Sequence, residues 1–307
     1  MLRQHLPWRQ RYAASVLTVA VAVVAALGGG PAAAQQATPT TPAGADAAAP
    51  SGALLPGHRI VAYYGNPLAP VLGALGEPPP DAMMARLKEA VGVYTAADPA
   101  RPALPALELI TPLAQSSPGN DGLYRSRMAP ETIEQVAGWA SDNDMLLILD
   151  VQVGRSSVAD EVQALLPYLK RPRTHLALDP EFDMPSGQLP GQELGSMNAD
   201  EINGAIGTLA QLVADNQLPP KLLIVHRFTP SMVSNASAIK LDPRVQVVID
   251  MDGFGGPDAK ISKYNAFVRD AGVQFGGIKL FYKQDTPRLM ADDVLALDPP
   301  PDVVIYQ

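Results

Sequence analysis

Three carboxylic acids occupy alternate positions near the middle of the chain. The apolar residues 176–178 lead directly into Asp179, Glu181 and Asp183, with Pro180 between the first two acids. Side chains of an extended chain alternate between its two faces, so the three acids would project to one side if the strand continued. Hydrolysis of a glycosidic bond uses such a group: one carboxylic acid with a raised pKa and a second carboxylate that stabilises positive charge.

Pro180 should end regular strand pairing and fix a turn, which would place the acids at the C-terminal rim of the strand. The alternative interpretation is a polar loop that caps a helix or binds a structural cation. These residues alone leave both interpretations open.

The acids belong to a longer pattern of short apolar runs that alternate with amphipathic segments from Arg59 onward. This alternation is typical of parallel strands joined by crossover helices, and continuous apolar runs indicate strands that are covered on both faces. The expected strands are residues 60–64, 106–110, 145–150, 174–179, 221–226, 245–250, 276–282 and 302–306.

The segments between these runs predict helices of unequal strength. The stronger patterns cover residues 81–94, 130–141, 158–169, 198–216 and 261–271, and weaker ones at 231–239 and 289–297 predict a single helical turn each. Eight strands with seven helical segments predict an α/β fold, a (β/α)8 TIM-like barrel without a regular eighth helix. The segment around Leu54 and Leu55 is a candidate to cover the side left open.

Catalytic residues of such barrels come from the C-terminal ends of several strands. We expect four acids to be catalytic: Asp150, Asp179, Glu181 and Asp250. We expect other polar residues at or after the strand ends to bind the substrate: Tyr63, Tyr64, Asn66, Asp183, His226, Asp252, Lys279 and Tyr282.

Each candidate also has a structural interpretation. Asp150 is suited to cap a helix, His226 to be a hydrogen-bonded rim histidine, and Asp252 to be a turn residue in the Gly-rich stretch 252–256. Aromatic residues near the expected rim suit either the core or a stacking platform for sugars. These are Tyr63, Tyr64, Phe254, Phe281 and Tyr282.

The pair Asp179 and Glu181, with Asp150 ending the preceding strand, resembles the DxE pattern of TIM-barrel glycoside hydrolases, chiefly the lysozyme and chitinase-like clans. The resemblance implies that Glu181 is the general acid and that Asp179 orients or stabilises an acetamido group. The chitinase-type DGxDxDxE run is absent, Pro180 fills the intervening position, and the first strand ends in Tyr-Tyr-Gly-Asn instead of an acid.

On this basis we expect a glycoside hydrolase-like protein that acts on an extracellular polysaccharide or peptidoglycan. Asp179 or Asp250 would stabilise the oxocarbenium-like charge, and Asp150 would raise the pKa of the acid by repulsion. The alternative is a non-catalytic barrel that binds a glycan or a surface partner through the same rim.

Motifs for other chemistries do not occur in the sequence. The histidines have no HxH, HExxH or HxxxH spacing, and neither a GxSxG elbow nor a phosphate-binding glycine motif follows any expected strand. We therefore expect no cofactor and no metal. A carboxylate-bound Ca²⁺ held by Asp179, Asp183 or Asp252 stays open, because hard cations accept oxygen ligands without regular spacing.

The N-terminus carries a targeting pattern. A basic start, an apolar run over about residues 13–27 and small residues at 32–34 predict a signal peptide over 1–34, with an uncleaved membrane anchor as the alternative. Residues 35–56, rich in Ala, Pro and Thr, predict a disordered linker before a barrel domain at 57–307. We expect a secreted, periplasmic or cell-surface protein.

The charge balance is acidic. Lys and Arg total 23 against 31 Asp and Glu, a formal net charge of −8, and loss of the three arginines before residue 34 leaves −11. Nucleic acid binding relies on clustered Lys and Arg, so we expect no nucleic-acid partner, and membrane contact only through an uncleaved signal segment. The chain has no cysteine, which excludes disulfides, thiol chemistry and a lipid-anchored lipobox.

Overall fold

The computed structural model describes residues 50–184 and 187–307. The expected signal peptide at 1–34 and most of the expected linker at 35–56 lie outside the described residues. Within the described ranges, no helix has both the length and the apolar composition that a membrane crossing requires.

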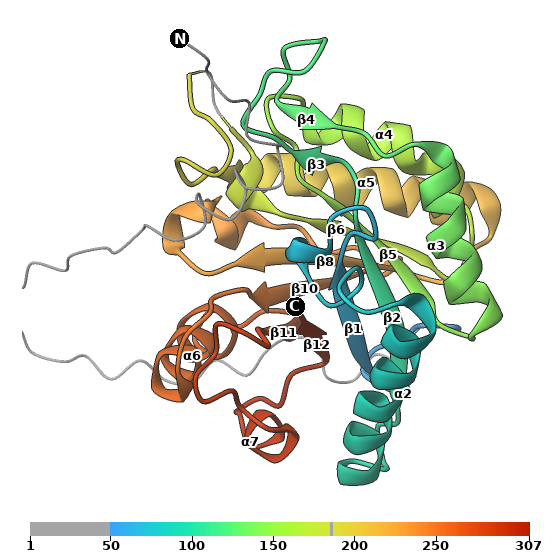
Figure 1. Cartoon of the computed structure of the whole chain (residues 1–307), viewed down its shortest axis with the longest axis vertical. Coiled ribbons are helices and arrows are strands. Elements are labelled where there is room, and N and C mark those ends of the chain that lie inside the picture. Colours follow the sequence, from blue (N-terminus) through green and yellow to red (C-terminus); the bar gives the residue numbers. More distant parts are fainter. Residues whose placement is uncertain (1–49, 185–186) are drawn as a thin grey trace, which may run out of the picture. The chain divides into compact units, whose positions relative to one another are not determined.

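Eight parallel strands close into a barrel, and their order around the ring follows the chain (Figure 1). The ring closes between the first and last strands, where Ile60 pairs with Val303 and Tyr63 pairs with Tyr306. The strands are β1 (Arg59–Gly65), β2 (Ala103–Ile110), β5 (Leu146–Val151), β6 (Thr174–Leu178), β8 (Lys221–Arg227), β10 (Val245–Met251), β11 (Phe275–Leu280) and β12 (Val303–Tyr306). The expected (β/α)8 TIM-like barrel is confirmed.

Helices connect these strands on the outside of the barrel (Figure 1). They are α2 (Pro80–Ala97), α3 (Pro130–Asp142), α4 (Val158–Leu169), α5 (Ala199–Asn216), α6 (Pro257–Tyr264) and α7 (Ala291–Leu295). The α6 helix begins four residues earlier than expected, since Pro257 occupies its first turn, and it continues as a π-helical turn over Asn265–Arg269. The weak pattern at 231–239 corresponds to single 3₁₀ turns at Pro230–Met232 and Ala236–Ala238.

Two short strand pairs lie outside the barrel sheet. The antiparallel pair joins β3 (Leu113–Ala114) to β4 (Arg125–Ser126), and the parallel pair joins β7 (Met197–Asn198) to β9 (Val233–Ser234). Asn198 also begins α5, where it forms a capping box with Glu201 that satisfies free N–H groups of the first turn. The first pair lies within the loop that follows β2, and the second joins the loop that follows β6 to the loop that follows β8.

No helix follows β12 in the described residues. The α2 helix lies next to this strand, because the Tyr94 hydroxyl is 3.1 Å from the Tyr306 hydroxyl. Leu55 does not cover the outer side of the barrel, as considered from the sequence, but is buried with the inward-facing side chains of the strands. The Gln246 side chain at the start of β10 accepts hydrogen bonds from the Leu54 and Leu55 N–H groups, so this segment closes the N-terminal end.

The strands have two differently packed faces. Outward-facing side chains pack against the helices, and inward-facing ones form a second apolar cluster that includes Ile60, Ala62 and Ile148. Because side chains alternate along a strand, neighbouring residues go to opposite faces. Further toward the C-terminal ends of the strands, the inward-facing residues change from apolar to charged, and these charged residues form the candidate site.

Candidate active site

Seven buried charged residues fill the C-terminal part of the barrel interior, and we call them the interior polar cluster. Each is on a barrel strand or immediately after one, and none exposes more than 8% of its surface. The members are Glu108 on β2, Asp150 on β5, Asp179 after β6, His226 on β8, Asp250 on β10, Asp252 after β10 and Lys279 on β11. Carboxylates and cations from six strands therefore meet at one end of the barrel, as the sequence predicts for the C-terminal end.

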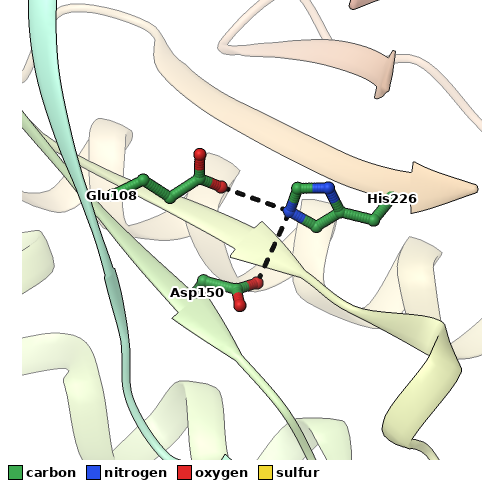
Figure 2. Close-up of side chains that lie close together, drawn as sticks. All are labelled: Glu108, Asp150 and His226. Atoms are coloured by element: carbon green, nitrogen blue, oxygen red, sulfur yellow. Dashed lines mark hydrogen bonds and ion pairs between the residues drawn. The ribbon is translucent and has the colours of Figure 1, made fainter. Parts of the chain in front are cut away.

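His226 lies at the centre of the cluster. Its Nε2 atom is 3.2 Å from Glu108 Oε1 and 3.7 Å from Asp150 Oδ1, and Figure 2 shows both carboxylates pointing at the ring. On the other side of the ring, Nδ1 is 3.0 Å from Asp250 Oδ2 and 3.5 Å from Asp252 Oδ2. Burial lowers the pKa of His226, but the hydrogen bonds to Asp250 and Glu108 outweigh it, and the pKa is well above its usual value.

Lys279 is the second cation of the cluster. Its Nζ atom is 3.1 Å from Asp252 Oδ2 and 3.5 Å from the centre of the Tyr64 ring, a cation–π contact. Burial lowers the pKa of Lys279, yet the charges of Asp252 and Asp179 raise it above its usual value. The Tyr64 hydroxyl donates to Asp150 Oδ2 at 3.3 Å and accepts from Gln152 at 3.1 Å. Tyr64 thus links the lysine to the carboxylates.

Acids outnumber bases in the cluster, and the pKa values of its carboxyls reflect this. Burial and then repulsion by Glu108 raise the pKa of Asp150 to about 6. Burial and then repulsion by Asp150 raise the pKa of Asp179 to about 7. A group with a pKa near neutral changes its protonation state easily at physiological pH, which suits acid–base chemistry.

Glu181 lies at the rim, on the 3₁₀ turn Pro180–Phe182 that follows β6. The residue as a whole is half-buried, whereas Asp150, Asp179 and Asp250 are buried. Burial, then the charges of Asp179 and Asp252, raise the pKa of Glu181 to about 8. The carboxyl is therefore mostly protonated at neutral pH, the state that a general acid requires.

Asp183 does not join the other two acids of its run. The chain turns at Pro180 instead of continuing as a strand, with Asp179 capping the turn by accepting from the Glu181 N–H at 3.3 Å. Burial, followed by the charge of the neighbouring Glu201 on α5, raises the pKa of the Asp183 carboxyl to about 7. The expectation that all three acids share one face is wrong for Asp183, because the turn redirects it.

Three further candidates lie away from the cluster. Tyr63 points outward because its neighbour Tyr64 points inward, and its hydroxyl is 2.9 Å from that of Tyr282. The Tyr282 ring lies under the Arg86 guanidinium of α2, with 3.7 Å to the ring centre. Asn66 donates to the Ile110 carbonyl and accepts from the Leu68 N–H. These contacts stabilise the outer layer and a loop, in agreement with the structural interpretation of the tyrosines.

Glu108 is a site residue that the sequence analysis did not select. It is fully buried and contacts His226 from the opposite side to Asp250. The available signal was an acid in the middle of the apolar run 106–110, since an unpaired charge is costly inside a buried strand.

The cluster is closed to solvent around its centre. Glu108, Asp150, His226 and Asp250 have no exposed surface. Two cavities in the described part of the chain lie elsewhere, one beside Glu77 and Gln307 and one between α6 and α7, and neither is lined by a cluster residue. Neither of these two cavities therefore leads to the interior polar cluster.

Comparison with known proteins gives likenesses in structure only, since no protein-family model and no curated protein matches this sequence. One similar structure is a GH5 xyloglucan-specific endo-β-1,4-glucanase from a metagenomic library, in complex with cellotriose. The two sequences are 13% identical, the match covers 72% of this chain and 77% of that chain, and the TM-score is 0.38. Another is a GH5-4 broad specificity endoglucanase from Clostridium acetobutylicum, with 15% identity, 76% and 81% coverage, and a TM-score of 0.40. A third is a ruminal GH26 endo-β-1,4-mannanase, with 11% identity, 82% and 59% coverage, and a TM-score of 0.39.

Proposed function

We propose that this chain is a secreted glycoside hydrolase-like protein that cleaves an extracellular polysaccharide or peptidoglycan, with Glu181 as the general acid. One observation carries the proposal. Glu181 is a half-buried residue on the turn that follows β6 at the C-terminal rim of the barrel, and its pKa of about 8 keeps its carboxyl protonated at neutral pH. Protonation of the leaving oxygen is the first requirement of glycosidic cleavage.

Asp179 is the carboxylate suited to stabilise the positive charge that develops on the sugar ring. It precedes Glu181 by two residues, and the two are coupled, because the charge of Asp179 raises the pKa of Glu181. Asp150 and Asp250 are fully buried and act through their neighbours, since both contact His226. The negative charge of Asp150 also favours the protonated form of Asp179.

An aromatic surface beside the rim suits a sugar ring. Phe254, in the loop after β10, is 59% exposed and packs edge-on against Phe281 with 6.0 Å between ring centres. Phe281 also lies 5.8 Å from the Lys279 Nζ atom of the cluster. An exposed aromatic ring offers a large apolar face on which the apolar face of a sugar ring can pack.

The test is glycan cleavage by the wild-type protein and by Glu181→Gln. The wild type should release reducing ends from at least one member of a panel that includes peptidoglycan, chitin, xyloglucan, mannan and β-glucans. The variant should lose at least about 100-fold in rate, the usual contribution of a general acid, with an unchanged circular dichroism spectrum. Glu193→Gln is the matched control, because Glu193 is an exposed glutamate in the same connection after β6. Equal cleavage by Glu181→Gln and wild type would reject the assigned acid.

The location outside the cytoplasm is part of the proposal and has its own measurement. Residues 1–34 have the composition of a signal peptide, so N-terminal sequencing of protein from the native host should give a start near Gln35. Protein that is found in the cytoplasm and whose N-terminal residue is Met1 would reject the proposed location.

Glycan binding without cleavage is a second candidate, and the complete burial of Glu108, Asp150 and Asp250 favours it. A binder should show no cleavage of any polysaccharide in the panel. It should also bind its glycan equally well as wild type and as Glu181→Gln, measured by isothermal titration calorimetry.

A further inference from the structure

Two carboxylates of the interior polar cluster approach the same ring nitrogen of His226. That nitrogen carries at most one hydrogen atom, so it cannot form a good hydrogen bond to both. Glu108 Oε1 and Asp150 Oδ1 both approach the Nε2 atom of His226, at 3.2 Å and 3.7 Å (Figure 2). The three ligand atoms lie within 4.8 Å of one another, and all three residues are fully buried. They come from β2, β5 and β8, so the barrel itself fixes their positions.

Two carboxylate oxygens of this group have no hydrogen-bond partner although they are buried. One is Asp150 Oδ1, which points at His226 Nε2 from a distance beyond a hydrogen bond, and the other is Glu108 Oε2. A buried carboxylate oxygen without a partner destabilises the folded state, because it has lost its hydrogen bonds to water and forms none in the protein. A cation between the three residues would satisfy the Asp150 oxygen and balance two negative charges at once.

The other ring nitrogen of His226, Nδ1, contacts Asp250. Nδ1 lies 3.0 Å from Asp250 Oδ2, within hydrogen-bond distance of this carboxylate. A carboxylate behind the ring orients a metal-binding histidine, so that its other nitrogen can coordinate the ion in place of its hydrogen atom. Asp250 therefore prepares Nε2 as a ligand.

The spacing agrees with a small first coordination shell. Metal–ligand bonds of about 2.0–2.2 Å at tetrahedral or octahedral angles separate neighbouring ligand atoms by about 3.0–3.5 Å. The measured 3.2 Å fits this range directly. The 3.7 Å separation of Asp150 Oδ1 is slightly longer and needs only a small side-chain adjustment.

We propose that Glu108, Asp150 and His226 bind one divalent transition-metal ion, Zn²⁺ or Mn²⁺, inside the barrel. One imidazole and two carboxylates suit these ions, whereas Mg²⁺ and Ca²⁺ prefer oxygen ligands alone. The ion displaces any hydrogen on Nε2, which leaves to the solvent as a proton. Because the ligands are buried, the ion enters during folding or through transient opening of the rim.

The test begins with the full chain, stripped of metal by EDTA in denaturant and refolded with no metal, Zn²⁺, Mn²⁺ or Mg²⁺. Mass spectrometric metal analysis after desalting should find one equivalent of Zn²⁺ or Mn²⁺. The unfolding temperature should rise by about 5–10 °C at a metal concentration of 100 times Kd, and Mg²⁺ should have little effect. No bound metal and no shift with either ion would overturn the proposal.

Variants assign the ion to these residues. Glu108→Gln and Asp150→Asn should each weaken binding at least about 100-fold. Glu161→Gln is the matched control, because Glu161 is also a buried carboxylate but lies outside the barrel between Arg125 and Arg127, and this variant should bind as wild type. Wild-type affinity in both ligand variants would contradict the proposal.

A measurement on the unmodified protein covers the case in which a ligand variant does not fold. Mn²⁺ should broaden the imidazole NMR signals of His226 and leave those of His58 unchanged. Co²⁺ should give a visible absorption band typical of nitrogen and oxygen ligands. The Glu181→Gln variant should bind the ion normally, so failure of the metal site and failure of the proposed catalysis are separate results.

Discussion

His226 and Asp250 lie opposite each other on the neighbouring strands β8 and β10, with 3.0 Å between Nδ1 and Oδ2. Gly277 on β11 pairs with Asp250 in the register of the sheet. A Cβ atom at position 277 would lie 2.7 Å from Asp250 Oδ1 and 3.1 Å from its Cβ atom. The absent side chain of Gly277 therefore provides the space in which Asp250 orients His226.

Gly277→Ala should displace the Asp250 carboxylate and destabilise the fold. Overpacking of a buried site costs about 1–3 kcal/mol of unfolding free energy, which urea unfolding measures. Gly138→Ala on α3 is the control, because no atom lies within 4 Å of the added Cβ, and it should be neutral or stabilising. An unchanged unfolding free energy in Gly277→Ala would show that the Asp250 position is not constrained by the glycine.

Lys279→Met should be strongly destabilising. The variant removes the cation that pairs with Asp252 and leaves an excess of buried acids, and loss of one partner of a buried pair costs about 3–5 kcal/mol. Lys283→Met is the matched control, because Lys283 is 64% exposed and pairs with Glu77 at the surface, where a salt bridge contributes about 0–1 kcal/mol. Thermal unfolding that finds equal losses in both variants would contradict the importance of the buried charge.

Asp183→Asn should make stability less dependent on pH. The pKa of Asp183 is raised to about 7 in the folded protein, by burial and by Glu201, against about 3.9 in an unfolded chain. The contribution of protonated Asp183 to the free energy of unfolding is therefore complete below about pH 4 and is lost as the pH rises through about 7. The unfolding temperature of the variant, relative to wild type, should therefore be higher at pH 8 than at pH 4, because the wild type loses stability between these two pH values. A constant difference between the two pH values would exclude titration of this carboxyl.

The hydrolytic rate should fall at alkaline pH. Glu181, the general acid of the proposed function, can donate a proton only while it is protonated, and its pKa is about 8. The value of kcat/KM, which reports pKa values of the free enzyme, should therefore decrease about tenfold for each pH unit above this value. A rate that stays constant from pH 7 to pH 10, in protein that remains folded, would exclude Glu181 as the acid.

Phe254→Ala should weaken glycan binding without changing stability. The ring is 59% exposed, so its loss costs little in folding, but it removes a stacking surface worth about 0.5–1.5 kcal/mol, which is about 2- to 12-fold in affinity. Val93→Ala on α2 is the control, since Val93 is 51% exposed on the outside of the barrel. Equal glycan affinity in Phe254→Ala and wild type would show that the Phe254 ring takes no part in glycan binding.

The strands were predictable because each is a local property of the chain. Each barrel strand is a short apolar run bounded by loop residues, and eight runs alternating with amphipathic segments admit few folds other than a barrel. The same reasoning placed Asp150, Asp179, His226 and Asp250 together, because each ends a parallel strand or follows it, and the C-terminal ends of parallel strands meet at one rim.

Local patterns could not determine which side of the sheet each residue faces. Tyr63 and Tyr64 are equally aromatic, and only the closed register sends the first toward Tyr282 and the second toward Lys279. The turn at Pro180 was expected, but its direction depends on contacts with distant residues: the Phe182 carbonyl accepts from the Gly154 N–H, and the Glu181 carbonyl accepts from the Gly195 N–H.

The amino-acid sequence by itself determined the barrel and the gathering of acids at one end of it, because hydrophobic period and strand-end chemistry are local and repeated. Only the tertiary structure decided that Glu108 completes the group around His226 and that most of its acids are buried. Burial and charge repulsion arise between residues distant in the chain, such as Glu108 and His226, so the pKa values of the site depend on the folded arrangement.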